Sequence, residues 1–211
     1  MSILITGGAG YIGSHTLIAL SEAGYDFVVY DNLSNSSKES IKRVEKIINK
    51  SISFEEGDIR DKEALKKVFK KYEIDSVIHF AGLKAVGESV EKPLEYYDNN
   101  VVGTIRLLEE FNCKKIVFSS SATVYDMTSY SILESGLKEE NLTWNTTNPY
   151  WTAKFILEQI LKDLANYSWF RVMNLRYFNP IWAHKSGLLW EEPNGIPNNL
   201  LPYIMKVANW E

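Results

Sequence analysis

Short apolar runs alternate with longer, more polar stretches from the N-terminus to residue 177. Continuous apolar runs predict buried strands, and the segments between them are long enough to form helices. The predicted strands cover residues 2–6, 27–30, 52–55, 76–80, 115–119 and 170–176. The predicted helices cover residues 14–23, 61–71, 93–112 and 149–167. This pattern indicates an α/β fold, a doubly wound parallel sheet covered by helices on both faces.

The first turn of the predicted fold carries a glycine pattern typical of a dinucleotide-binding site. Gly7, Gly10 and Gly13 follow the first strand and lead into the first helix. Glycines let the backbone turn tightly and approach a pyrophosphate, whose charge is stabilised at a helix N-terminus. The second strand ends at Asp31, whose carboxylate can accept hydrogen bonds from a ribose and would repel a 2′-phosphate. The sequence therefore predicts a Rossmann-type site for NAD rather than NADP.

A second candidate site lies between the fifth and sixth strands. Tyr150 and Lys154 are four residues apart, so they share one helix face. A nearby ammonium favours the phenolate, which predicts a Tyr150 pKa lowered from about 10 and a general base at this position. Ser121, just after the fifth strand, would hydrogen-bond the same substrate oxygen. In this place the pair resembles the catalytic pair of the short-chain dehydrogenases/reductases.

Composition excludes several other functions. The formal net charge is −4 without a basic stripe, which argues against a nucleic-acid partner. The single cysteine, Cys113, excludes an internal disulfide, and His15, His79 and His184 have no metal-ligand spacing. A signal peptide and an apolar run long enough to span a bilayer are both missing. We therefore expect a soluble cytoplasmic protein without a metal site.

Longer motifs resemble the UDP-glucose 4-epimerases of the extended short-chain dehydrogenase/reductase superfamily. They cover residues 7–15, 79–100, 119–125, 175–180 and 194–200, and the similarity extends over nearly the whole chain. Nucleotide-sugar 4,6-dehydratases usually carry an Asp-Glu pair where this chain has Ala122-Thr123. The resemblance implies interconversion of UDP-galactose and UDP-glucose in galactose metabolism. In that reaction NAD accepts the C4 hydride of the sugar and then returns it to the opposite face.

The resemblance also implies roles for individual residues. Tyr150 takes the C4 hydroxyl proton, Lys154 supports the phenolate and Ser121 contacts the substrate. The implied cofactor-binding residues are Gly7, Gly10, Tyr11, Ile12, Gly13, Asp31, Asn32, Asn35, Ser36, Asp58, Ile59, Phe80, Ala81, Gly82, Lys84, Asn99, Tyr150, Lys154, Tyr177 and Phe178. The implied substrate-binding residues are Lys84, Ser121, Tyr150, Asn179, Asn198, Asn199 and Leu200.

Four tryptophans stand where members of this group usually have glycine: Trp151, Trp182, Trp190 and Trp210. A large ring at a buried glycine position is expected to overpack it, at a cost of about 1–3 kcal/mol each. Two explanations remain open, a divergent protein or glycine codons read as tryptophan. The chain also ends at Glu211, well before members of the group do, so weak or absent turnover is expected.

The predicted domains are an NAD-binding Rossmann domain at residues 1–177 and the truncated beginning of a substrate-binding domain at 178–211. Two alternatives to the leading function remain. One is a related nucleotide-sugar epimerase with a different hexose preference, and the other is a non-catalytic NAD-binding fragment. The resemblance also suggests a homodimer formed by the helices at 93–112 and 149–167, although core packing would require the same apolar faces.

Overall fold

The structure, a computed structural model, describes residues 1–111, 114–125, 138, 139, 141–143, 145–181, 183–191, 204 and 207. Its chain forms two compact units. The first comprises residues 1–58, 63–81 and 179–211, and the second comprises residues 59–62 and 82–178. The division into domains at residues 177 and 178 stays a prediction.

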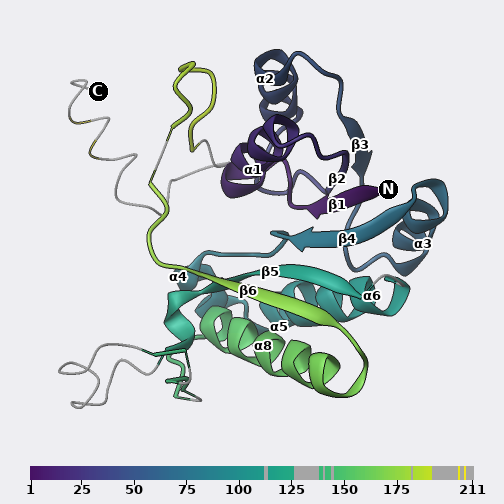
Figure 1. Cartoon of the computed structure of the whole chain (residues 1–211). Coiled ribbons are helices and arrows are strands. Elements are labelled where there is room, and N and C mark those ends of the chain that lie inside the picture. The colour runs from purple at the N-terminus through teal and green to yellow at the C-terminus, as the bar shows by residue number, and fades with distance from the viewer. Residues whose placement is uncertain are drawn as a thin grey trace. The chain divides into compact units, whose positions relative to one another are not determined.

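The first unit contains four parallel strands in the order β3-β2-β1-β4. They are β1 (Ser2–Thr6), β2 (Phe27–Asp31), β3 (Ser53–Glu56) and β4 (Ile74–His79). Two helices, α1 (Tyr11–Glu22) and α2 (Lys38–Ile48), lie on one face, and α3 (Lys62–Lys71) lies on the other (Figure 1). The core between the first face and its helices is aliphatic, and its buried members are Ile5, Ala9, Leu17, Ile18, Val29, Ile41, Val44 and Leu189. This packing fixes the position of the turn between β1 and α1.

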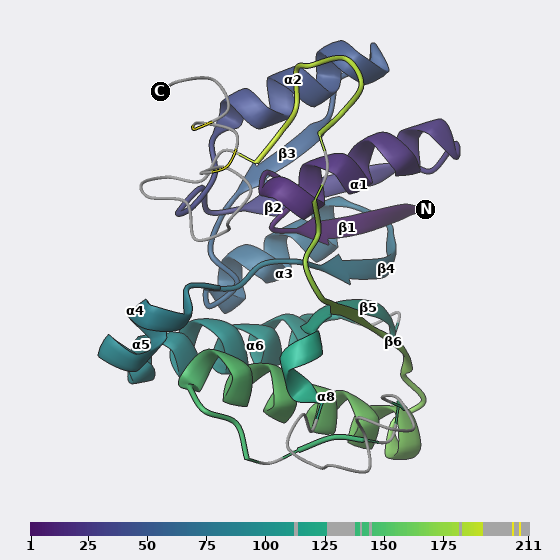
Figure 2. The same cartoon turned by 90° about the vertical axis from the view of Figure 1, so that its left-hand side faces the viewer.

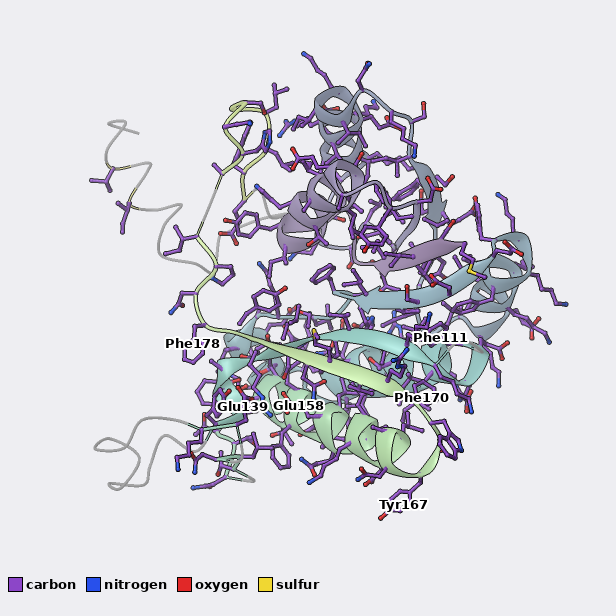
Figure 3. All side chains as sticks on the ribbon, viewed as in Figure 1. Phe111, Glu139, Glu158, Tyr167, Phe170 and Phe178 are labelled. Atoms are coloured by element: carbon purple, nitrogen blue, oxygen red, sulfur yellow. The ribbon has the colours of Figure 1, made fainter. Side chains whose placement is uncertain are left out.

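The second unit is built on two parallel strands, β5 (Lys115–Ser121) and β6 (Arg171–Tyr177), paired so that Ser121 lies opposite Tyr177. Helix α8 (Pro149–Tyr167) runs along both strands (Figure 2). At the other end of the strands, the rings of Phe111 and Phe170 meet edge to face with centroids 6.4 Å apart (Figure 3). The remaining elements are α4 (Val86–Glu91), α5 (Pro93–Tyr97), a π-helical turn η1 (Asp98–Val102), α6 (Gly103–Glu110) and a 3₁₀ turn η2 (Ala122–Val124).

The strand order along the sheet is β3-β2-β1-β4-β5-β6, and the pairs β1–β2, β1–β4, β2–β3 and β5–β6 are parallel. This order is that of the doubly wound fold, so the predicted fold class is confirmed. Among the helices that the structure describes, none is long and apolar enough to cross a membrane.

Several boundaries differ from those predicted. Helix α1 begins at Tyr11 rather than at Ser14, because the glycine turn itself leads into the helix. Strand β3 is displaced by one residue and β4 begins earlier, at Ile74. Strands β5 and β6 each extend one or two residues further, to Ser121 and Tyr177. These shifts occur at element ends, where apolar patterning carries the least information.

Two helices were not predicted at all. Helix α2 begins at Lys38, and its buried residues are Ile41 and Val44, which stand among charged residues. Helix α4 is a short helix of six residues that ends at Glu91, just before Pro93. The long helix predicted at 93–112 is interrupted by η1 and ends at Glu110.

Candidate active site

The turn between β1 and α1 has no room for side chains at two of its glycines. Gly7 has a φ of +69°, and a Cβ there would lie 2.5 Å from the Ala81 backbone nitrogen. A Cβ on Gly13 would lie 2.4 Å from the Gly7 carbonyl oxygen. Gly10 is the N-cap of α1. Because glycine has no side chain, it offers no side-chain cap to the backbone N–H groups of the first helical turn. A helix N-terminus of this kind fits an anionic group such as a pyrophosphate.

Asp31 connects this turn to the loop after β2. Its carboxylate is buried and accepts hydrogen bonds from the Ala9 N–H (3.0 Å), the Leu33 N–H (2.8 Å) and the Ser36 hydroxyl (3.0 Å). A carboxylate offers about four acceptor positions, so capacity remains for a ribose hydroxyl. Asp31 therefore has a structural role that the sequence analysis missed, while the predicted ribose contact stays a prediction.

Asn32 and Asp58 lie together at the same edge of the first unit. The Asn32 amide donates to the Asp58 carboxylate at 3.1 Å, and the Tyr30 hydroxyl donates to the Asp58 carbonyl oxygen at 2.9 Å. Two of the predicted cofactor-binding residues are thus neighbours. Ile59, predicted beside them, is buried in the second unit, and Asn35 lies on the loop before α2.

The segment after β4 is held by β1. The N–H groups of Phe80 and Ala81 both donate to the Thr6 carbonyl oxygen, at 2.9 and 3.1 Å. This arrangement places Ala81 against Gly7, where a side chain on the glycine would collide with it.

In the second unit the structure brings together the three predicted catalytic residues. Ser121 ends β5, and its hydroxyl is hydrogen-bonded to that of Tyr150 in the first turn of α8. The Thr123 hydroxyl also donates to Ser121 Oγ, at 2.9 Å. The Lys154 ammonium lies 5.8 Å from the centre of the Tyr150 ring and donates to the Ser119 carbonyl oxygen at 2.6 Å. A hydroxyl pair and a cation therefore meet at the carboxyl end of β5.

The start of α8 is determined by its sequence. Asn148 is the N-cap, and its side-chain oxygen accepts a hydrogen bond from the Trp151 N–H at 3.0 Å. Pro149 occupies the first helical position, where its missing N–H costs nothing. Tyr150 is therefore fixed one residue into the helix, on the face that also carries Lys154.

Electrostatics in this cluster differ from the prediction in one respect. Burial raises the pKa of Tyr150 above its usual value, and the hydrogen bond with Ser121 opposes this only in part. The expected lowering is wrong, because burial is the dominant effect on Tyr150, and the Lys154 ammonium donates its hydrogen bond to the Ser119 carbonyl oxygen. Burial also lowers the pKa of Lys154 to about 8, against the field of Glu158. Lys154 is thus mostly protonated at pH 7.

Lys84 lies on a loop that is clamped on both sides. The side-chain amide of Asn100 accepts from the Leu83 N–H at 2.8 Å and donates to the Leu83 carbonyl oxygen at 2.9 Å. On the other side, the Tyr96 hydroxyl accepts from the Ala85 N–H at 3.0 Å and donates to Glu88 at 2.9 Å. The backbone on either side of Lys84 is therefore fixed.

The π-helical turn η1 explains how Asn99 and Asn100 reach this region together. Both asparagines are adjacent in sequence, and both are buried. A π turn adds one residue to the helical turn and is often found at functional sites. Sequence analysis selected Asn99 and missed Asn100 and Tyr96. Both residues lie inside the motif at residues 79–100, and this position could have indicated that they belong to the site.

The remaining predicted residues lie in different parts of the chain. Tyr177 ends β6 opposite Ser121, and burial raises its pKa. Phe178 is exposed and its ring stacks on that of Tyr125, with centroids 6.3 Å apart. Asn179 is exposed and belongs to the first unit. The predicted substrate contacts Asn198, Asn199 and Leu200 lie outside the described residues.

Two of the four unusual tryptophans can be located. Trp151 is half-buried in the first turn of α8. Trp190 is 43% exposed, and the Arg43 guanidinium lies 4.6 Å from its ring centre. Neither ring is fully buried, and the overpacking stays a prediction. Trp182 and Trp210 lie outside the described residues.

Comparison with known proteins gives a consistent result. Residues 3–210 match the model of the NAD dependent epimerase/dehydratase family. A UDP-glucose 4-epimerase of Yersinia enterocolitica is 58% identical over 99% of this chain, and one of Mus musculus is 52% identical over 98%. The crystal structure of UDP-glucose 4-epimerase from Bifidobacterium longum in complex with NAD+ and UDP superposes with a TM-score of 0.92. It is 50% identical in sequence over 99% of this chain.

The chain spans only part of these relatives. It covers 62% of the Yersinia protein, 61% of the mouse protein and 62% of the Bifidobacterium structure. The similarity therefore concerns the portion that contains the glycine turn and the Ser121, Tyr150 and Lys154 cluster.

Proposed function

The chain belongs to the NAD dependent epimerase/dehydratase family, and on this premise we propose that it is the NAD-binding and catalytic portion of a UDP-glucose 4-epimerase. The observation that carries the proposal is the meeting of Ser121, Tyr150 and Lys154 at the end of β5. The chain is 58% identical to a relative of that name. The reaction proposed is the interconversion of UDP-galactose and UDP-glucose.

The residues of the glycine turn fit NAD. We assign the pyrophosphate to Gly7, Gly10, Tyr11, Ile12 and Gly13, because the turn excludes side chains and the N-terminus of α1 lacks a side-chain cap. Asp31 would accept from the adenosine ribose, with Asn32, Asn35, Ser36, Asp58 and Ile59 around the adenosine. The nicotinamide half is assigned to Phe80, Ala81, Gly82, Lys84, Asn99, Tyr177 and Phe178. When bound, NAD accepts a hydride from a carbinol carbon and can return it.

The proton chemistry belongs to the second unit. Tyr150 would accept the C4 hydroxyl proton while Ser121 holds the same oxygen by a hydrogen bond. Because burial raises the pKa of Tyr150, the phenolate needs a cation beside it. Lys154 is the buried cation next to Tyr150, and its pKa of about 8 keeps it mostly protonated at pH 7. The 4-keto sugar formed would then regain a proton from Tyr150 on the way back.

Other parts of the proposal rest on the family. The UDP-sugar would contact Lys84, Asn179, Asn198, Asn199 and Leu200. Residues 1–177 would form the NAD-binding domain and 178–211 the beginning of a substrate-binding domain. The proposal also includes a cytoplasmic location and a homodimer formed through α5, α6 and α8. A related nucleotide-sugar epimerase and a non-catalytic NAD-binding fragment are the alternatives.

The experiment is a set of thermal-shift and turnover measurements on the purified chain. We expect NAD to raise the melting temperature and UDP to raise it further, because a ligand that binds only the folded state stabilises it. With NAD and UDP-galactose, we expect at most weak formation of UDP-glucose, measured by anion-exchange chromatography. Tyr150→Phe should lose turnover and keep the NAD shift. Protection by NAD alone, with no product, would favour the non-catalytic fragment. Turnover retained by Tyr150→Phe would exclude Tyr150 as the base.

A further inference from the structure

Three consecutive residues at the end of β5 contact three successive turns of α8. The Ser121 hydroxyl meets Tyr150, the Ser119 carbonyl oxygen accepts from Lys154 at 2.6 Å, and the Ser120 hydroxyl donates to the Glu158 carboxylate. Tyr150, Lys154 and Glu158 are spaced by four residues, so they lie on one helix face. The proposed function uses the first two contacts of this series. Glu158 has no assigned role in it.

Glu158 is a buried carboxylate with an elaborate set of partners. Only 2% of it is exposed. Arg176 of β6 binds both of its oxygens, with Nε 3.0 Å from Oε1 and Nη2 2.8 Å from Oε2. Such a two-point arginine pair fixes the plane of a carboxylate as well as its position. A buried ion pair is weak evidence for stability, because desolvation offsets the attraction. The arrangement therefore calls for another explanation.

Arg176 also has partners other than Glu158, namely Glu139 and Tyr125. Its Nη1 donates to the Glu139 backbone carbonyl oxygen at 3.1 Å and also contacts the Glu139 carboxylate. Its guanidinium lies 4.7 Å from the Tyr125 ring centre. Figure 3 shows Glu158 and Glu139 toward the end of β6 that leads to Phe178. Glu158 is thus fixed from β5, from β6 and through Arg176 from the segment around Glu139.

We propose that Glu158 is a positioning residue of the active site, held by Ser120 and Arg176 one helical turn beyond Lys154, where its negative charge keeps Lys154 an ammonium. The catalytic consequence rests on the proposed function, since only a charged Lys154 can support a Tyr150 phenolate. The charge relation between Glu158 and Lys154 does not depend on that function.

The surroundings of Lys154 support this assignment. On α8 its ionisable neighbours are Tyr150 and Glu158, β5 contributes the Ser119 carbonyl and the Phe118 ring, and β6 contributes Arg176 through Glu158. Burial favours the neutral amine. Within the part of the chain that the structure describes, Glu158 is the group whose field opposes that effect.

The test is an NMR titration of the Lys154 side chain in the full chain without NAD. Lysine is labelled with ¹³C at Cε, and the Lys154 signal is identified by its loss in Lys154→Arg. In Glu158→Gln, which keeps the shape of the side chain and removes its charge, the pKa of Lys154 should fall. In Glu158→Asp, which keeps the charge, it should recover part of that loss.

The matched control is Glu109→Gln. Glu109 is a glutamate of the same unit paired with Lys62 and Arg106 on the surface, so its loss should leave the Lys154 titration unchanged. An unchanged or raised pKa of Lys154 in folded Glu158→Gln would overturn the proposal.

If Glu158→Gln does not fold, Arg176→Gln gives a test of opposite sign. This variant removes the guanidinium that is paired with the Glu158 carboxylate, so the negative charge of Glu158 acts on Lys154 without that compensation. The pKa of Lys154 should therefore rise, and a fall would overturn the proposal. Because the titration needs neither NAD nor turnover, a chain that fails to epimerise can still confirm or refute the role of Glu158.

Discussion

The glycine turn allows a prediction in which two structural effects can be separated by matched variants. Gly7 and Gly24 both have positive φ, +69° and +78°. Alanine at either position must adopt a backbone conformation that costs about 1–2 kcal/mol. The two sites differ in space, because a Cβ on Gly7 would lie 2.5 Å from backbone nitrogen of Ala81, whereas a Cβ on Gly24 has no heavy atom within 4 Å.

The expected magnitudes follow from this difference. Gly24→Ala should lose only the conformational cost, about 1–2 kcal/mol of unfolding free energy. Gly7→Ala should lose in addition about 1–3 kcal/mol, because backbone atoms must move apart. For a chain of this size each kcal/mol lowers the melting temperature by about 2–4 °C. Gly7→Ala should therefore melt about 2–12 °C below Gly24→Ala.

The assay is thermal and urea unfolding of both variants, followed by circular dichroism. Gly87→Ala is a third variant, because Gly87 lies in α4 without close contacts and without positive φ, so alanine there should be neutral or stabilising by up to about 1 kcal/mol. NAD binding should also be lost in Gly7→Ala and kept in Gly24→Ala. Equal stability of the Gly7 and Gly24 variants would refute the account of the turn.

Three further predictions concern single residues. Asp31→Asn replaces an acceptor for three donors by a group with one oxygen, so it should lose about 1–3 kcal/mol in urea unfolding and bind NADP better relative to NAD; unchanged stability would contradict the hydrogen bonds described. In the folded chain the pKa of Lys154 is lowered to about 8, whereas in the unfolded chain it is 10.5, so between these pH values the unfolded chain binds more protons. Over this range the stability of the chain, compared with that of Lys154→Met, should rise with pH by at most about 3 kcal/mol. A flat difference between the two pH profiles would show that Lys154 is not desolvated. Trp190→Gly should destabilise by about 1 kcal/mol, through loss of the Arg43 contact, whereas stabilisation would support the overpacking that the sequence suggested.

The sequence was sufficient for the parts of the fold that have strong local signals. The strands predicted at 2–6 and 27–30 and the glycine turn between them combine apolar runs with conformational requirements that few residues satisfy. Helix α8 was predicted at about residues 149–167 and is observed at Pro149–Tyr167, where Asn148 and Pro149 define its start. The spacing of Tyr150 and Lys154 was enough to place them on one face beside Ser121.

Other features depended on tertiary contacts that leave little trace in the pattern. Helix α2 is mostly charged and is ordered by the packing of Ile41 and Val44 on the sheet. The π turn η1 is stabilised by the hydrogen bonds between Asn100 and Leu83, across 17 positions of the chain. These distant partners determine the local structure, so a local window does not reveal it.

The electrostatics of the site were the least predictable part. Proximity of Lys154 suggested a lowered pKa for Tyr150, but burial acts in the opposite direction and is stronger. The sequence could not show that the Lys154 ammonium donates to the Ser119 carbonyl oxygen, or that Glu158, one helical turn further on, is paired with Arg176. Direction and burial of a side chain are properties of the packed structure.

The central claim, that this chain holds NAD in the glycine turn and beside Asp31, is tested most directly by calorimetric titration of the purified chain with NAD and with NADP. We predict saturable binding of NAD and binding of NADP weaker by about tenfold or more, because the Asp31 carboxylate would face the 2′-phosphate. An absence of NAD binding by the folded chain, or equal affinity for the two dinucleotides, would contradict the account.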